Sequence, residues 1–177
     1  VNEVENSLFE RLVTLPNCPN AIVPKGSRAE DNRITFTVTE MPQLPANAQP
    51  HWELAKKYNI IDFELGNKLT GAGFPVYKGK GAVLQRALIA FFLDKAAEAG
   101  YQEVQVPHMV NKDSAFATGQ LPDKEGQMYH VTLDDFYLIP TAEVPITNMY
   151  RDEIIDERQL PVKNVGYTPC FRREAGS

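Results

Sequence analysis

Two short clusters of polar residues have the types and spacing to bind a small charged ligand. The first is Thr141-Ala142-Glu143, in which one residue separates a hydroxyl from a carboxylate. Both groups accept hydrogen bonds, so together they can hold a small ammonium group. The same pattern suits the start of a helix, with Thr141 as the cap and Glu143 in the first turn. Spacing alone favours the helix cap, but capping and binding can coexist.

The second cluster is Arg172-Arg173-Glu174 near the end of the chain. If this stretch is a strand, Arg172 and Glu174 lie on one face and Arg173 on the other. The planar fork of Arg172 suits a phosphate or a carboxylate, and Glu174 adds an acceptor beside it. The alternative is an exposed ion pair of little energetic value, which spacing alone favours.

Other kinds of site find little support in the sequence. The three histidines lie far apart, and none has a second ligand at metal-binding spacing, so no metal site is expected. Cys18 and Cys170 form no C-x-x-C pair, which indicates a reducing compartment. Cys170 falls in an expected strand and is predicted to pack as a small apolar group. The glycine patterns of nucleotide-binding loops are absent.

Composition narrows the class of protein further. The 177 residues include 18 basic and 23 acidic side chains, a net charge of −5, with 43% hydrophobic and 23% charged residues. These proportions are typical of a soluble globular protein. No apolar run approaches the length of a membrane span. The acidic balance argues against a protein that coats DNA through bulk charge.

The N-terminal third reads as a helix followed by a connector. Residues 1–15 carry Val1, Val4, Leu8 and Leu12 at spacings of three and four, which predicts the end of a longer coiled-coil helix. The alternative is an ordinary amphipathic helix packed on its own domain. Residues 16–50 are rich in proline and indicate a connector. Within it, the alternation over residues 33–40 predicts a half-buried strand.

The remaining residues predict an irregular mixture of helices and strands. No regular strand–helix–strand spacing appears, so the fold class is predicted as α+β with an antiparallel sheet flanked by helices. Helices are expected over residues 51–58, over 82–99, where Gly100 stops the helix, and over 142–151, with Pro145 in the first turn. Strands are expected over residues 104–106, ending at Pro107, and over 165–171. A hairpin is expected over residues 128–131 and 136–139.

Taken in order, these segments resemble the seryl-tRNA synthetase family of class II. Residues 1–15 resemble the end of its N-terminal coiled-coil arm, and residues 16–50 a connector. Residues 51–177 resemble the first part of its catalytic domain, with the specific runs LIPTAEVPITN and YTPCFRREAGS. Class II motif 1 corresponds to residues 81–111, the serine-binding Thr-x-Glu to 141–143, and the first half of motif 2 to 167–177.

The resemblance implies an ATP-dependent reaction and its partners. Serine would attack the α-phosphate of ATP, giving seryl-adenylate and pyrophosphate, and the seryl group would pass to the 3′ end of tRNA(Ser). A cytoplasmic homodimer formed through motif 1 is implied, with Pro107 at its interface. Mg²⁺ is expected to accompany ATP, with ligands outside this chain.

The resemblance also implies roles for individual residues. Thr141, Glu143 and the backbone of Ala142 would hold the serine ammonium group. Arg172, the expected catalytic residue, would bridge the serine carboxylate and the α-phosphate. Glu174 would accept a hydrogen bond from the adenine amino group. Arg173 belongs to the same ATP-binding stretch, but strand alternation points it away from Arg172, so no catalytic role is predicted for it.

Two other classes of protein remain open at this point. One is a synthetase-like ligase that loads an amino acid onto a carrier protein, although the coiled-coil remnant favours the tRNA enzyme. The other is a non-catalytic dimerisation or binding module, which the intact polar clusters disfavour. Since the family continues beyond motif 2, we expect this chain to be a fragment that does not complete aminoacylation by itself.

Overall fold

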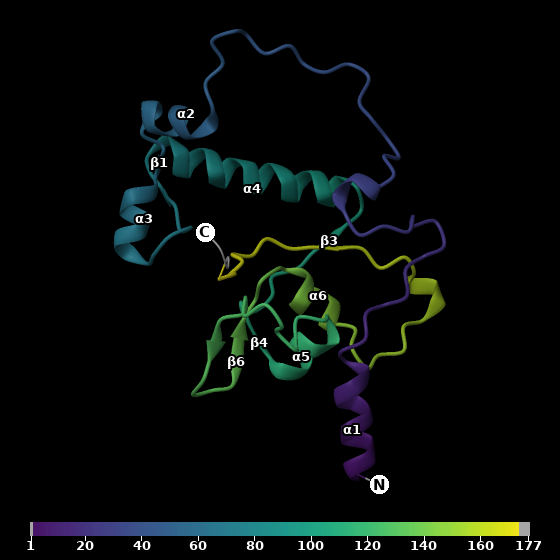
Figure 1. The fold of residues 1–177 in the computed structure, drawn as a ribbon. Helices are drawn as coiled ribbons and strands as arrows, with labels where there is room; N and C mark the ends of the chain where they lie inside the picture. Colours follow the sequence, from purple (N-terminus) through teal and green to yellow (C-terminus); the bar gives the residue numbers. More distant parts are fainter. Residues whose placement is uncertain (1, 174–177) are drawn as a thin grey trace. The chain divides into compact units, whose positions relative to one another are not determined.

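The computed structural model describes residues 2–173, and the chain divides into two compact units, Val1–Pro50 and His51–Ser177 (Figure 1). The helices are α1 (Asn2–Leu12), η1 (Ala29–Asp31), α2 (His51–Tyr58), α3 (Phe63–Leu69), α4 (Lys80–Glu98), α5 (Lys112–Ala117), α6 (Glu143–Asn148) and η2 (Glu157–Gln159). The strands are β1 (Ile61–Asp62), β2 (Val76–Tyr77), β3 (Gln102–Glu103), β4 (Met109–Asn111), β5 (His130–Val131), β6 (Phe136–Leu138) and β7 (Asn164–Val165).

The helix predicted at the start of the chain is present from Asn2 as α1. Its ends suit the helix dipole, with acidic residues in the first turn and Arg11 in the last. The apolar stripe is exposed at Val4, Leu8 and Leu12, by 72%, 55% and 54%. The helix therefore does not pack this stripe into a core of its own domain, contrary to the alternative considered from the sequence. Val1 lies outside the described residues.

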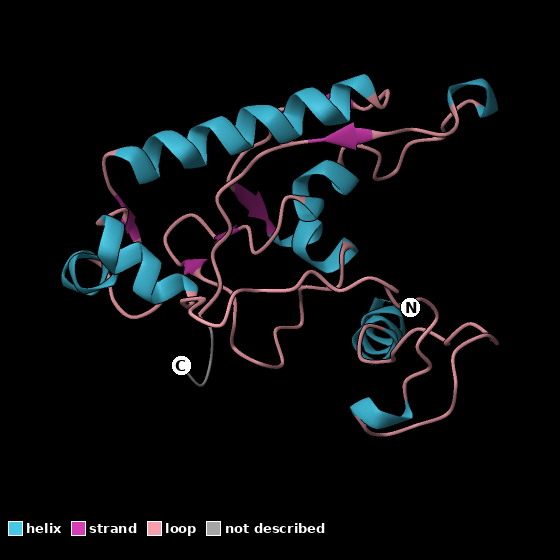
Figure 2. Cartoon of the chain, turned by 90° about the horizontal axis from the view of Figure 1, so that it is seen from above, coloured by secondary structure: helices cyan, strands magenta, loops and turns pink. Residues whose placement is uncertain are grey.

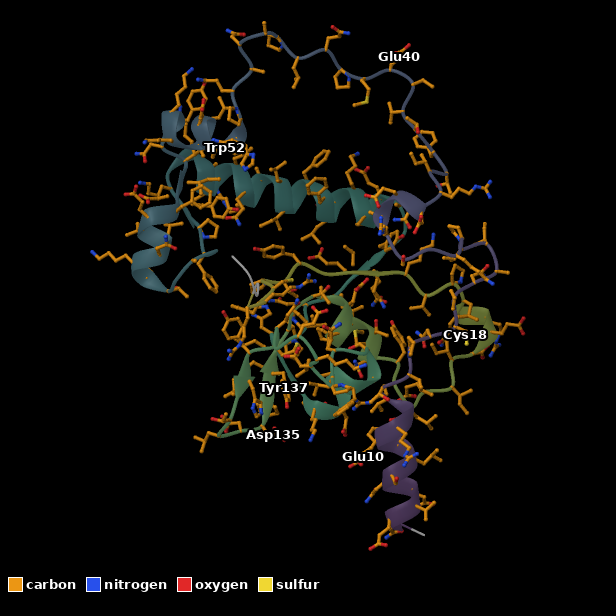
Figure 3. The ribbon with its side chains drawn as sticks, viewed as in Figure 1. Glu10, Cys18, Glu40, Trp52, Asp135 and Tyr137 are labelled. Carbon is orange, nitrogen blue, oxygen red and sulfur yellow. The ribbon has the colours of Figure 1, made fainter. Side chains whose placement is uncertain are left out.

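The strand predicted over residues 33–40 is wrong. This stretch of the first unit has no regular secondary structure, and Ile34 and Phe36 are about 80% exposed. Figure 3 labels Glu40 on this long loop. A strand is stable only when its backbone groups pair with a neighbour. The alternating sequence has no such neighbour among the described residues, so it does not form a strand.

The second unit begins with α2, as predicted, and a small antiparallel pair formed by β1 and β2. Asp62 links this pair to α3, because its carboxylate accepts the backbone N–H of Leu65 at 2.8 Å and caps the helix. The same carboxylate pairs with the ammonium group of Lys78 at 2.8 Å. The Lys78 hydrogen bond and then the Leu65 N–H lower the pKa of Asp62 below its ordinary value.

Helix α4 is the longest element, seen in Figure 2 as the long cyan helix. It begins two residues before the predicted start, after Gly79, and ends before Gly100, with φ angles of 50° and 81° at the two glycines. Both angles favour glycine, which explains these boundaries. The apolar face predicted from the sequence is exposed, at Leu84, Leu88, Phe91 and Phe92.

A three-stranded antiparallel sheet in the order β4-β6-β5 lies beside α5 and α6. The hairpin predicted over residues 128–139 is confirmed by β5 and β6. Figure 3 labels Tyr137 on β6 and Asp135 in the turn before it. Tyr137 packs against both buried clusters of this unit. These are Val110, Ile139 and Val144, and Ala115, Leu121 and Met128. The core therefore lies directly beneath the end of β6.

The last pair of strands departs from the prediction. Strand β7 covers only Asn164–Val165 and pairs with β3 in a parallel direction, so the sheets are not all antiparallel. The two strands are joined by a crossover of about sixty residues, which permits parallel pairing. Residues 166–171 are not a strand, and the strand predicted over residues 104–106 is wrong, because β3 ends before it, at Glu103. Within residues 2–173, no helix is long and apolar enough to span a membrane.

Candidate functional site

A pocket of about 390 Å³ opens in the second unit where β6 ends. Its wall combines main-chain turns, two guanidinium groups, the hydroxyl of a threonine and two aromatic rings. The lining residues are Ala72, Gly73, Phe74, Pro75, Tyr129, Pro140, Thr141, Cys170, Arg172 and Arg173. Segments distant in sequence therefore meet at one cavity, and two of them carry the clusters singled out from the sequence.

The end of β6 is the fixed side of the pocket. Ile139 and Pro140 are both buried, and the backbone N–H of Ile139 donates to the carbonyl of His108 at 3.0 Å. Phe171 donates its backbone N–H to the Ile139 carbonyl at 2.9 Å, which brings the C-terminal segment alongside. Because Ile139 is fully buried in the core, its two hydrogen bonds hold the segment against a rigid support.

Arg172 reaches the same support through its side chain. Its Nε donates a hydrogen bond to the carbonyl oxygen of Pro140 at 3.1 Å. A guanidinium carries five N–H donors in a fixed plane, so this bond orients the whole group. The two terminal nitrogens make no hydrogen bond to another residue within 2–173 and remain available for an anion. Pro140 immediately precedes Thr141, so the bond to its carbonyl holds the Arg172 guanidinium in the same pocket as Thr141.

The Thr-x-Glu cluster is arranged differently from the predicted cap. Helix α6 starts at Glu143 and its capping position is Ala142, with no hydrogen bond from a capping side chain. The Thr141 hydroxyl stands 3.5 Å from the backbone nitrogen of Glu143, at the limit of a hydrogen bond. The hydroxyl is therefore only weakly engaged. Thr141 lines the pocket, whereas Ala142 and Glu143 do not.

Arg173 was predicted to point away from Arg172, and this is wrong. Both arginines line the same pocket, because residues 171–173 are not in a regular strand and strand alternation does not apply. The Arg173 guanidinium carbon lies 5.2 Å from the centre of the Tyr129 ring. Glu174 lies outside the described residues. Pro107 is exposed and distant in sequence from the pocket-lining segments.

Several lining residues were missed from the sequence. Tyr129 belongs to no recognised chemical motif, and residues 72–75 lie at a turn that carries no charged or nucleophilic side chain. Positive φ angles at Gly71 and Gly73 (154° and 88°) shape that turn, so its two glycines were the available signal. Cys170 was predicted to be packed in a strand, but it is an exposed free thiol that lines the pocket. No three His, Cys, Asp or Glu side chains of residues 2–173 gather to hold a metal ion.

Comparisons with known proteins identify the family to which the chain is similar. A family model described as the tRNA synthetase class II core domain (G, H, P, S and T) matches residues 129–177. The serine–tRNA ligase of Salinibacter ruber is 53% identical over 177 residues, which is 100% of this chain and 41% of that protein. The chain belongs to the seryl-tRNA synthetase family. The Syntrophotalea carbinolica family member is 47% identical, over 100% of this chain and 42% of its own length.

Solved structures of family members share the fold. A seryl-tRNA synthetase from Pyrococcus horikoshii, crystallised with ATP, has a TM-score of 0.90 and 32% identity, over 99% of this chain and 44% of that chain. A cytoplasmic seryl-tRNA synthetase from Naegleria fowleri, solved with AMP, has a TM-score of 0.85 and 26% identity, over 99% and 42%. The fold is thus part of the class II synthetase core, and the chain spans about two fifths of these seryl-tRNA synthetases.

Proposed function

We propose that the pocket is the serine-activating site of an ATP-dependent serine–tRNA ligase. One observation carries this proposal: Arg172 is anchored by Nε to Pro140 and lies in one pocket with Thr141. The serine carboxylate would attack the α-phosphorus of ATP, the bond to pyrophosphate would break, and seryl-adenylate would form. The seryl group would then pass to the 3′-terminal adenosine of tRNA(Ser). The relative crystallised with ATP supports the choice of nucleotide.

Arg172 has the chemistry to bring the two reactants together. Its terminal nitrogens would contact the serine carboxylate on one side and the α-phosphate on the other. Both groups are anionic and repel each other, so a shared cation lowers the cost of bringing them into contact. The same cation would stabilise the negative charge that grows on the phosphate oxygens during attack. The Pro140 anchor would fix this geometry before the substrates arrive.

The serine ammonium group is assigned to the Thr-x-Glu segment. The weakly engaged hydroxyl of Thr141, the backbone of Ala142 and the carboxylate of Glu143 would accept its hydrogen bonds. Because Glu143 is exposed and does not line the pocket, its side chain would have to turn toward the ligand. Glu174 would accept a hydrogen bond from the adenine amino group. Mg²⁺ is expected with ATP, and we assign none of the described residues to it.

Replacing Glu143 with glutamine tests the ammonium site. We expect the KM for serine to rise at least tenfold in the full-length protein, because a hydrogen bond to a charged group contributes about 1.5–3 kcal/mol. The KM for ATP should change little. The measurement is serine-dependent ATP–pyrophosphate exchange. Glu157→Gln, at an exposed carboxylate of η2, is the matched control. An unchanged serine KM in Glu143→Gln would remove Glu143 from the site.

We further propose that the protein forms a homodimer through the exposed face of α4, in the segment that resembles motif 1. Leu84, Leu88, Phe91 and Phe92 are each exposed by 45–64% on this helix. Apolar side chains gathered in this way mark interaction surfaces. Pro107, also exposed, is assigned to the same interface. A cytoplasmic location is proposed as well, and the free thiols of Cys18 and Cys170 support it.

A charge on the α4 face tests the dimer. Leu88→Glu places a carboxylate in the apolar surface, so we expect the full-length protein to become monomeric at micromolar concentration. The mass in solution, measured by light scattering or sedimentation, gives the result. Arg86→Glu, on the same helix but off the apolar face, should leave the mass unchanged. A Leu88→Glu protein that keeps the wild-type mass would contradict this interface.

A further inference from the structure

The turn that precedes β5 is built around one carboxylate. Asp123 accepts the backbone N–H groups of Gln127 at 3.0 Å and Met128 at 2.8 Å. Burial acts to raise the pKa of Asp123, but the backbone N–H donors, led by Met128 and Gln127, together lower it below its ordinary value. The carboxylate is therefore ionised at neutral pH and fixes the turn. Met128, at its end, belongs to the buried core.

This turn contacts the segment that carries Arg172. The backbone N–H of Arg173 donates to the carbonyl of Gln127 at 3.0 Å. The Arg173 guanidinium carbon lies 5.2 Å from the centre of the Tyr129 ring, within the range of a cation–π contact. Tyr129 is itself fixed, because its carbonyl accepts the backbone N–H of Leu138 on β6 at 3.0 Å. The segment is thus held on a second side, independently of Ile139 and Pro140.

We propose that Tyr129 and Arg173 are positioning residues for Arg172. Their contact, with the Gln127 hydrogen bond, fixes the backbone on the C-terminal side of Arg172, while Phe171 and Ile139 fix the other side. Only the side-chain torsions of Arg172 can then vary, and its hydrogen bond to the Pro140 carbonyl limits them. The proposal rests on the proposed serine-activating function, and it gives Arg173 a role through Arg172 rather than a direct role toward ATP.

The energetic argument favours an effect on the chemical step. A cation–π contact at a partly exposed site has a modest energy, equivalent to about two- to fivefold in an equilibrium. Displacing a catalytic group by about 1 Å can cost a hundredfold in rate. Loss of the contact is therefore expected to lower kcat more than it raises the KM for ATP. A residue that binds ATP directly would show the opposite balance.

A double-mutant cycle in the full-length protein tests the proposal. We expect Tyr129→Leu and Arg173→Met each to lower kcat of pyrophosphate exchange about tenfold, with the KM for ATP changed by less than about threefold. The double variant should be no slower than the slower single variant, because both changes remove one contact. Tyr129→Phe keeps the ring and should restore near-wild-type rates. Tyr101→Leu is the matched control, since Lys163 lies 5.7 Å from its ring away from the pocket.

Hydrogen exchange provides a readout that needs no activity. The amide of Arg173, bonded to Gln127, should exchange several times faster in Tyr129→Leu and Arg173→Met and remain unchanged in Tyr101→Leu. Additive losses in the cycle, a selective rise in the KM for ATP in Arg173→Met, or unchanged amide exchange would each overturn the proposal. A wild-type protein without serine-dependent exchange would instead refute the proposed function, and the amide measurement would still decide whether the contact holds the segment.

Discussion

Replacing Arg172 with lysine is expected to slow adenylate formation by about 10²- to 10³-fold, the cost of removing a donor aimed at developing charge. Lysine keeps the positive charge but has a single nitrogen. In the structure, Arg172 uses Nε to hold the Pro140 carbonyl at 3.1 Å and keeps two terminal nitrogens for ligands. One ammonium group cannot anchor itself and also bridge a carboxylate and a phosphate.

Serine-dependent ATP–pyrophosphate exchange by the full-length protein measures this effect. Arg158→Lys is the matched control, because Arg158 is an exposed arginine paired with Asp156 away from the pocket. It should retain the wild-type rate. Thermal unfolding of both variants separates a lost contact from a lost fold. If Arg172→Lys exchanged within about threefold of wild type, Arg172 would not be the bridging residue.

Replacing Gly66 with alanine is expected to destabilise the protein by about 3 kcal/mol, at the upper end of the cost of overpacking. Gly66 is buried in α3, and a Cβ there would overlap the carbonyl oxygen of Phe74. The obstructing atom belongs to the backbone, so no side-chain rotation can relieve the overlap. The turn of residues 72–75, which forms one wall of the pocket, would have to move.

Urea unfolding and serine-dependent exchange together measure this second effect. The midpoint of unfolding should fall, and the residual activity should show a raised KM for serine or ATP, because the displaced wall changes the shape of the pocket. Asn67→Ala, at the exposed neighbouring position, is the control and should be neutral or slightly stabilising through helix propensity. Identical unfolding midpoints for Gly66→Ala and wild type would contradict the close packing of α3 on this turn.

Local patterns predicted those elements whose stability is local. Helix α4 and the β5–β6 hairpin were found because periodicity, Gly100 and the turn residues all act within a few positions. The strand over residues 33–40 failed for the opposite reason: alternation indicates a face to bury, but none of the residues that the structure describes forms a strand that pairs with it. The parallel pairing of β3 with β7 joins residues about sixty positions apart, and no local sequence pattern indicates it.

The sequence predicted some of the residues that form the candidate site, but not how they are arranged in space. Thr141 and Arg172 were identified by type and by resemblance, and both line the pocket. The carbonyl of Pro140 that anchors Arg172 is a backbone group, and any residue type at that position would offer one. Tyr129 and Cys170 were missed for a related reason. Their roles depend on where distant segments meet, which one sequence does not specify.

The hydrogen bonds that join the pocket segments also bear on which insertions the protein can tolerate during evolution. Residues 139–140 and 171–172 meet through their own hydrogen bonds, and residues 152–162 between them are mostly exposed and do not line the pocket. Lengthening an exposed loop costs only about 0.6 kcal/mol for each doubling of its length. Insertions there can accumulate over generations while the pocket keeps its geometry, which leaves this stretch free to diverge between lineages.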